Sequence, residues 1–286
     1  MLTVTSADDT DVRAFDQGQG PVILIVHPGF STGESWGKVA ARLADQFRVV
    51  RIVRRHYRLD LTLPSPYSMD REVDDVIALA RAVGEPVVIV GHSSGGVVAL
   101  EALAASPATF AGAVLFEPPI TLDPPSSAEA SAEASTEAST EASAEASAEP
   151  VGEAFDRARS AVTVGQPGKA MQVFIRDVVG LPAPHAWLVR LIVTVSPKLR
   201  ALVPRQLTDL DGVGFRLDAY ARITTPVVLL GGERSPAHLG ARLDALAAAL
   251  PNARRVSMPR RDHDAQVKAP GEVAEVIGGL AREVFG

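Results

Sequence analysis

Short apolar runs alternate with longer amphipathic segments along most of the chain. The runs are rich in β-branched residues and apolar at nearly every position, which is typical of strands covered on both faces. They predict strands over Val12–Phe15, Val22–His27, Arg48–Val53, Val87–Val90, Gly112–Phe116, Val227–Leu230 and Arg254–Met258. Helical periodicity predicts helices over Glu34–Gln46, Asp70–Val83, Ser94–Ala105, Ala237–Leu250 and Glu272–Phe285. This alternation predicts an α/β fold with a mainly parallel, doubly wound sheet.

The alternation stops after Phe116 and resumes near Thr225. We therefore expect residues 1–118 and 223–286 to form one core, interrupted by an insertion. The insertion begins with a low-complexity segment at 119–150. It continues with helix-like apolar stretches over Ala154–Val164, Lys169–Val179 and Ala186–Val195, so that 151–222 is predicted to be a helical cap over the sheet.

The low-complexity segment repeats Ser, Ala and Glu every four residues and offers no apolar face to bury. We expect a solvated, disordered segment, with a transient helix as the alternative, because glutamates four residues apart repel each other. The repeat itself, residues 127–150, holds six glutamates, and without them the chain has 28 acidic and 28 basic residues. Outside the repeat the chain therefore has no net charge, and it lacks the positive electrostatic potential that would attract nucleic acid or an anionic membrane. We expect neither as a partner.

Composition excludes several kinds of chemistry. The chain has no cysteine, which removes disulfides and thiolate catalysis, and its six histidines are dispersed, which indicates no metal site. The acidic N-terminus does not look like a signal peptide, and the apolar stretches are too short to cross a bilayer. We therefore expect a cytoplasmic protein without a cofactor or metal.

The motif Gly-His-Ser-Ser-Gly at 91–95 joins a predicted buried strand to a predicted apolar helix. This strand–turn–helix context is that of a nucleophile elbow, in which flanking glycines allow a tight turn that exposes the serine hydroxyl. Ser93 is therefore the predicted nucleophile. The alternative is an ordinary glycine-rich turn.

Acyl transfer also needs two backbone N–H donors for the oxyanion. Ser94, directly after the nucleophile, would supply one. The loop His27-Pro-Gly-Phe would supply the other, from Gly29 or next from Phe30, since Pro28 has no N–H. His27 is expected to orient this loop.

His263 lies after the last predicted strand, where the general base of such a site is expected. His92 lies inside the elbow and is expected to pack or to line the substrate pocket. For the carboxylate that would orient the base, Glu117 ends one strand and Glu233 follows the next. We favour Glu117 and keep Glu233 as the alternative, because strand ends at this edge carry catalytic groups.

These motifs, in this order, resemble the α/β-hydrolase superfamily over residues 10–118 and 224–286. Ser35-Trp36 and the run Arg54–Arg58 make the chain similar to actinobacterial serine α/β hydrolases. The resemblance implies the α/β-hydrolase fold, and an acid after the strand that follows the nucleophile has precedent in certain haloalkane dehalogenases. Those dehalogenases and the epoxide hydrolases use an aspartate nucleophile, which Ser93 is not. Pro28 and Ser235 depart from the usual pattern, Ser235 standing where the acid is common.

The leading hypothesis is an esterase-like serine hydrolase acting on a small, largely apolar ester or carbonyl substrate. Trp187 and other apolar residues of the cap (Phe155, Phe174, Ile175, Leu188 and Leu191) would either contact that substrate or form the cap's own core. A non-hydrolytic lyase or cyclase, and a ligand-binding protein without turnover, are the alternatives, because fold alone does not determine reaction type.

Overall fold

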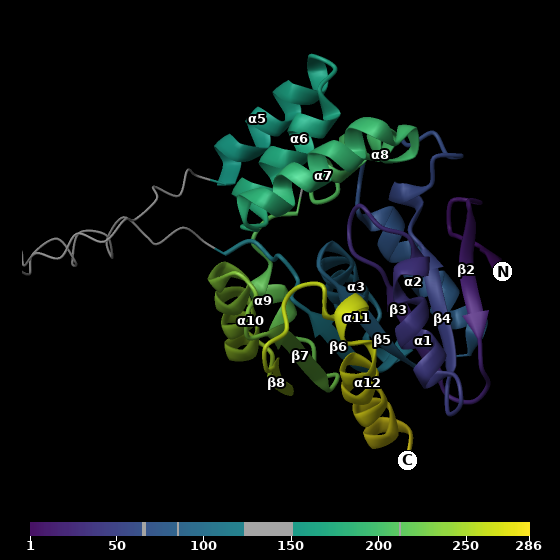
Figure 1. Ribbon diagram of the computed structural model, residues 1–286. Helices are drawn as coiled ribbons and strands as arrows, with labels where there is room; N and C mark the ends of the chain where they lie inside the picture. Colours follow the sequence, from purple (N-terminus) through teal and green to yellow (C-terminus); the bar gives the residue numbers. More distant parts are fainter. Residues whose placement is uncertain (65–66, 85, 123–150, 212) are drawn as a thin grey trace, which may run out of the picture. The chain divides into compact units, whose positions relative to one another are not determined.

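The computed structural model describes residues 1–64, 67–84, 86–122, 151–211 and 213–286 (Figure 1). The chain divides into two compact units, one of Met1–Ile120 with Ala201–Gly286 and one of Thr121–Arg200. Most of the Ser/Ala/Glu repeat, including all six of its glutamates, lies outside the described residues, so its predicted disorder stays a prediction.

The first unit is built on an eight-stranded sheet with the order β1-β2-β4-β3-β5-β6-β7-β8. The strands are β1 (Leu2–Thr5), β2 (Asp11–Gln17), β3 (Val22–Val26), β4 (Arg48–Val53), β5 (Val87–His92), β6 (Phe110–Phe116), β7 (Val227–Gly232) and β8 (Ala253–Met258). β1, β2 and β4 pair antiparallel, and from β4 onward every pairing is parallel. The carboxyl ends of β3 to β8 therefore meet at one edge, which is the edge where ligands bind in such sheets.

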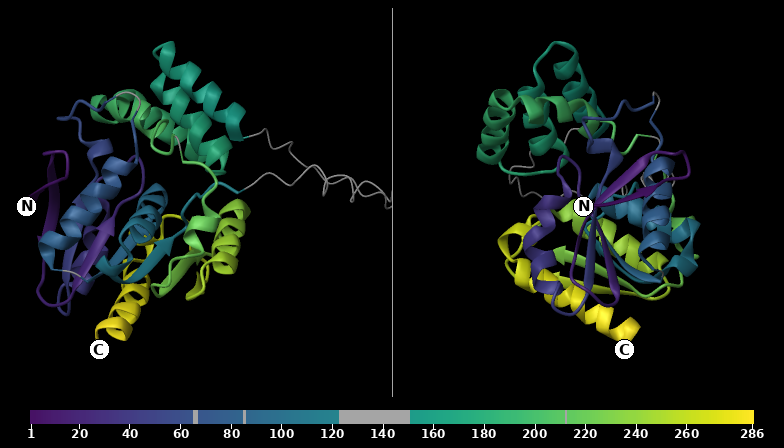
Figure 2. Two further views of the ribbon diagram at one scale, coloured as in Figure 1. Left: turned by 180° about the vertical axis from the view of Figure 1, so that it is seen from behind. Right: turned by 90° about the vertical axis from the view of Figure 1, so that its right-hand side faces the viewer.

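Helices cover both faces of this sheet (Figure 2). They are η1 (Gly33–Trp36), α1 (Gly37–Leu43), η2 (Arg55–Tyr57), α2 (Asp70–Val83), α3 (Ser94–Ala105), η3 (Pro107–Thr109), α9 (Leu217–Tyr220), α10 (Ala237–Ala249), α11 (Ala265–Lys268) and α12 (Pro270–Phe285). α1, α11 and α12 bury Val39, Ile277 and their neighbours against Ile23, Val90 and the other strand residues of one face. The alternate strand residues, such as Leu24 and Ile89, are equally buried, which explains why these strands are apolar at every position.

The predicted doubly wound α/β fold is confirmed, and the predicted strands lie within one or two residues of β2 to β8. β1 was not predicted. It is a four-residue edge strand that pairs only with β2 and is exposed at every second position, so it lacks the continuous apolar signal of the inner strands.

The second unit is helical, as predicted, with α5 (Val151–Thr163), α6 (Pro167–Val173), the π-helix η5 (Phe174–Val178) and α7 (Ala183–Val195). Its core consists mainly of small residues such as Ala154, Ala158 and Ala170. The placement of a cap over the sheet stays a prediction.

The second compact unit ends at Arg200, within the range 151–222 that the sequence predicts as the cap. α8 (Pro197–Gln206) begins in the second unit and ends in the first, to which residues 201–222 belong. Polar contacts connect this segment to the first unit: the Arg205 guanidinium donates to the carbonyls of His56, Arg58 and Leu61, and Asp209 pairs with Arg54. Leu202, Val203 and Leu207 are buried as well.

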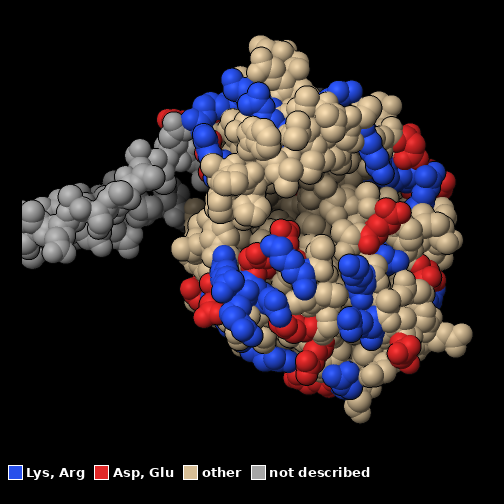
Figure 3. All heavy atoms as spheres, viewed as in Figure 1, with Lys and Arg blue, Asp and Glu red and all other residues tan. Residues whose placement is uncertain are grey.

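On the face of the first unit visible in Figure 3, basic and acidic side chains are interspersed. In the part of the chain that the structure describes, no helix combines the length and apolarity needed to span a bilayer.

Candidate active site

Backbone strain is concentrated at the carboxyl edge of the sheet. Five described residues other than glycine have positive φ, and four of them follow parallel strands: Phe30 after β3, Ser93 after β5, Glu117 after β6 and Arg260 after β8. Such conformations cost roughly 1–3 kcal/mol each and cluster at functional sites. These strained residues therefore indicate that the candidate active site lies at this edge of the sheet.

Ser93 occupies the turn between β5 and α3, with φ 52° and ψ −128°. Its N–H donates to Phe116 O at 2.9 Å, which holds the turn to the neighbouring strand β6. Gly91 and Gly95 are required by close approach. A Cβ on Gly91 would lie 2.6 Å from Gly96 Cα, and one on Gly95 would collide with the carbonyl oxygen of His27. The motif is thus a strained strand–turn–helix junction rather than an ordinary glycine-rich loop.

The structure brings Glu117 and His263 together across 146 residues of sequence, with 2.6 Å between Glu117 Oε2 and His263 Nδ1. The other oxygen, Glu117 Oε1, accepts the N–H of Gly232 at 2.7 Å. A carboxylate only accepts hydrogen bonds, so Nδ1 carries the imidazole proton and Nε2 is left with a lone pair. The Ser93 hydroxyl makes no hydrogen bond to another described residue, and a nucleophile–base bond often tightens only when substrate binds.

The other acids near His263 have different partners. Glu233 Oε2 accepts the N–H of Arg260 at 2.8 Å and so braces the loop that carries His263. Asp262 pairs with Lys268 at 2.6 Å, and Asp264 lies 3.8 Å from the same ammonium group. Glu117 is therefore the carboxylate that is hydrogen-bonded to the histidine.

His92 is buried in a stack of rings. Its imidazole lies parallel to Phe116 with 4.4 Å between ring centroids, and 4.7 Å from the centroid of His263. Burial, and then the neighbouring His263, hold the pKa of His92 well below its ordinary value. His92 is therefore neutral near pH 7, and this environment favours its packing role over a place in the substrate pocket.

The candidate oxyanion donors come from two segments, the start of α3 and the loop after β3. Ser94 is the first residue of α3 and is buried. The backbone of Phe30 interacts with the Tyr57 hydroxyl, an interaction that opposes the rise in the pKa of Tyr57 caused by burial and by Asp209. Because the Phe30 amide has this partner, Gly29 is the better candidate for the second donor.

Sequence reasoning missed Arg54. It was noted only as part of the arginine run, yet it is 1% exposed and donates to Ser94 Oγ at 2.9 Å. The sequence feature that could have revealed it is an arginine directly after a predicted buried strand. An arginine that faces inward at such a position needs carboxylate partners.

Trp187 belongs to the second unit, where it is exposed on α7 together with Leu188, Leu191 and Ile192. Phe155 and Phe174 contact each other with 5.7 Å between ring centroids. A substrate-binding role for Trp187 stays a prediction.

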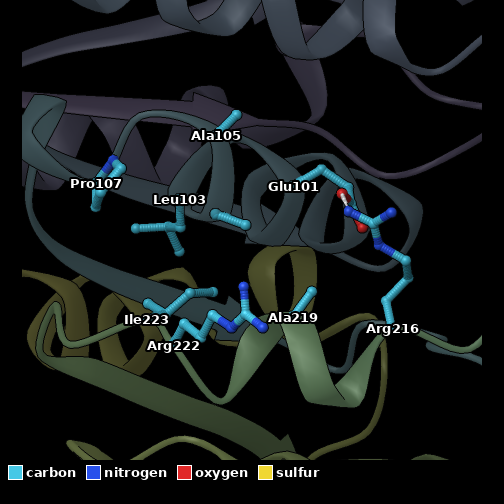
Figure 4. Close-up of a pocket in the computed structure, with 9 residues that line it drawn as sticks. Glu101, Leu103, Ala105, Pro107, Arg216, Ala219, Arg222 and Ile223 are labelled. Carbon is cyan, nitrogen blue, oxygen red and sulfur yellow. Dashed lines mark hydrogen bonds and ion pairs between the residues drawn. The ribbon is translucent and has the colours of Figure 1, made fainter.

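No group of three or more histidine, aspartate and glutamate side chains suited to a metal ion occurs in the described ranges. A surface pocket of about 240 Å³ lies between α3 and residues 216–223. Figure 4 shows the residues that line it. Its Glu101 carboxylate is already engaged by Arg216 at 2.9 Å and by the Tyr220 hydroxyl at 2.6 Å, and none of Ser93, Glu117 and His263 lines it.

Two buried histidines predict how stability depends on pH. Burial, and then Arg54, lower the pKa of His27 to about 3, and the pKa of His92 is lowered as well. Below about pH 6.5 the unfolded chain binds two protons that the folded chain does not, so the free energy of unfolding falls as the pH falls. His27 should account for a loss of about 2 kcal/mol between pH 7 and pH 5 in urea unfolding, and the lowered pKa of His92 should add to it.

The His27→Asn variant should lose about half as much over the same interval, because one of the two titrating groups is gone. The matched control is His185→Gln, which removes an exposed histidine and should follow the wild type. An unfolding free energy that is equal at the two pH values would contradict the assignment of neutral, buried imidazoles.

A strained serine at a strand–turn–helix junction, with a hydrogen-bonded glutamate–histidine pair at the same edge of a doubly wound sheet, defines the α/β-hydrolase class. The sequence matches the model of the alpha/beta hydrolase family over residues 23–276. The chain belongs to this family.

Similar proteins agree with this membership. An alpha/beta hydrolase from Sphaerobacter thermophilus matches with a TM-score of 0.75 and 28% identity over 100% of both chains. A thermophilic esterase from Thermogutta terrifontis has a TM-score of 0.71 and 19% identity over 100% of this chain and 99% of its own. The lipase LipV from Mycobacterium tuberculosis is 31% identical over 116 residues, 40% of this chain and 44% of the lipase. That match thus spans less than half of the lipase.

Proposed function

We propose that the protein is an esterase-like serine hydrolase that uses Ser93, His263 and Glu117 as its catalytic triad. The hydrogen bond between Glu117 and His263, at the same sheet edge as the strained Ser93, carries the proposal. Glu117 fixes the tautomer in which Nε2 of His263 can take a proton, and its charge stabilises the imidazolium that forms. Membership of the family, and the lipase name of a relative matched over part of its length, support the same reading.

In the first half of the reaction, Ser93 Oγ bonds to the acyl carbon and its proton moves to His263 Nε2. The carbonyl electron pair becomes the oxyanion, for which the N–H groups of Ser94 and Gly29, or Phe30 in place of Gly29, are the proposed donors. When the tetrahedral intermediate collapses, the alcohol leaves with the proton from His263, and an acyl-enzyme remains. Water then repeats the sequence, with His263 as base and then as acid, and releases the carboxylic acid.

A small, largely apolar ester is the proposed substrate, because the second unit exposes apolar side chains such as Trp187, Leu188 and Leu191. The chemistry needs no metal or cofactor. A protein that only binds ligands has no use for a strained serine together with a paired glutamate and histidine. This disfavours the ligand-binding alternative.

The test is the hydrolysis of p-nitrophenyl butyrate and phenyl butyrate in the presence of methanol. Both esters should yield methyl butyrate and butyrate in the same ratio, because both pass through one acyl-enzyme. EDTA should leave the rates unchanged. Ratios that differ between the two esters would contradict an acyl-enzyme, and no turnover by the wild type above the uncatalysed rate would contradict the hydrolase function itself.

A further inference from the structure

Arg54 is a fully buried cation with a complete set of partners. It follows β4 directly, and its guanidinium donates to Glu72 at 2.7 and 3.1 Å and to Asp209 at 2.5 and 3.4 Å. Burial alone would lower the pKa of Arg54, but the charges of Asp209 and Glu72 hold it well above its ordinary value. Burying such a cluster costs several kcal/mol per ion, and apolar residues of similar size often stabilise a fold equally well. We therefore expect this cluster to have a role other than stabilising the fold.

The two remaining hydrogen bonds of the guanidinium reach the two segments that carry the proposed oxyanion donors. Nη1 of Arg54 donates to Ser94 Oγ at 2.9 Å, and it lies 3.4 Å from the carbonyl oxygen of His27. The backbone N–H of Arg54 donates to His27 Nε2 at 3.2 Å, so the proton of His27 is on Nδ1, which donates to Pro28 O at 2.8 Å. Arg54 thus holds the start of α3 and the loop after β3 at a fixed separation.

The partners of Arg54 also support the backbone of Gly29. Asp209 accepts from the Tyr57 hydroxyl at 2.7 Å, and the oxygen of that hydroxyl lies 3.0 Å from Gln206 Oε1. A Cβ on Gly29 would lie 2.5 Å from Gln206 Oε1 and 2.8 Å from the Tyr57 oxygen. The backbone at Gly29 therefore rests directly on this cluster, with no space for a side chain between them.

We infer that Arg54 is a positioning residue for the oxyanion hole: it sets the distance between the N–H groups of Ser94 and Gly29 without touching substrate. The inference rests on the proposed function. The planar guanidinium suits this role, because its donors point in fixed directions, whereas a lysine would offer one mobile charge. A small error in donor placement weakens oxyanion stabilisation in the transition state and leaves ground-state binding unchanged.

The test compares Ser94→Ala and Arg54→Lys. The first keeps the N–H donor and removes the hydroxyl that Arg54 and its partner Asp209 hold. We expect kcat for p-nitrophenyl butyrate to fall about tenfold in Ser94→Ala and about 50-fold in Arg54→Lys, with KM within about twofold in both. The double variant should be no slower than Arg54→Lys, because both changes break the same connection.

A readout specific to the oxyanion is the inhibition constant of an alkyl trifluoromethyl ketone, whose hemiketal with Ser93 carries an oxyanion. This constant should rise in proportion to the loss of kcat/KM, while the constant of the matching methyl ketone stays the same. The control is Arg51→Lys. Arg51 is a buried arginine within β4, and it donates to Gly33 O at 2.9 Å and to Gln17 at 3.0 Å, away from the elbow.

Unchanged kcat and trifluoromethyl ketone inhibition in Ser94→Ala, or changes no larger than those of Arg51→Lys, would overturn the positioning role in an otherwise active enzyme. Ser94→Ala keeps the test decisive if Arg54→Lys does not fold. A wild type that neither hydrolyses esters nor binds the trifluoromethyl ketone would instead overturn the proposed function, and the positioning role with it.

Discussion

Replacing Ser93 with alanine is expected to lower kcat for ester hydrolysis by about 10⁴- to 10⁶-fold while KM changes only a few-fold. The size of the effect follows from the role of Ser93 Oγ, which forms the bond to the acyl carbon. The strained backbone at φ 52° is fixed by the N–H bond to Phe116 and by the close packing of Gly95, so alanine should adopt the same turn. The residual rate would come from the oxyanion donors and substrate binding.

The matched control for this change is Ser31→Ala. Ser31 follows the loop of the other proposed donor, and its hydroxyl lies 2.7 Å from the Ser35 hydroxyl. Its removal should change kcat by less than about threefold. Activity retained within about tenfold in Ser93→Ala, at matched folding by circular dichroism, would show that another residue forms the bond.

Replacing Glu117 with glutamine is expected to lower kcat by about 10³- to 10⁴-fold. Glutamine is close in size and can still accept the N–H of Gly232, but it presents no negative charge to His263 Nδ1. The imidazolium formed in the transition state then loses its stabilising partner, and the wrong tautomer of the imidazole becomes accessible. Measuring kcat with p-nitrophenyl butyrate checks this.

Glu233→Gln is the matched control, because Glu233 lies after the next strand and braces the Arg260 backbone instead. Its kcat should stay within about fivefold of the wild type, since a neutral amide oxygen can accept the same N–H group. A larger loss in Glu233→Gln than in Glu117→Gln would reverse the assignment of the acid.

Most of the fold could be predicted from sequence because its inner strands have a strong local signal. Val22–Val26 and Val87–Val90 are apolar at every position, and Ser94–Ala105 begins directly at the elbow, so the strand–turn–helix junction is visible without any long-range information. β1, and the place of residues 201–222 in the first compact unit, are not visible in the local sequence pattern. Both depend on pairing or polar contacts between distant residues, such as that of Arg205 with the carbonyl of His56.

In the candidate site too, some residues have a local sequence signal and others depend on contacts between distant residues. Ser93 and His263 could be selected from motif and position, but nothing in the sequence tells which of Glu117 and Glu233 faces the histidine. That depends on the positive φ of Glu117, which lets the chain turn just after β6. Arg54 was missed because its ion-pair partner Asp209 lies 155 residues later in the chain.

The proposed account depends on one bond, that between Ser93 Oγ and the electrophilic atom of the substrate. The most direct measurement is intact-protein mass spectrometry after treatment with a fluorophosphonate, followed by peptide mapping of the adduct. The expected result is one adduct per chain, carried by Ser93, absent from Ser93→Ala and formed more slowly in Glu117→Gln. A wild type that stays unmodified, or an adduct of equal yield in Ser93→Ala, would contradict the assignment of Ser93 as the nucleophile.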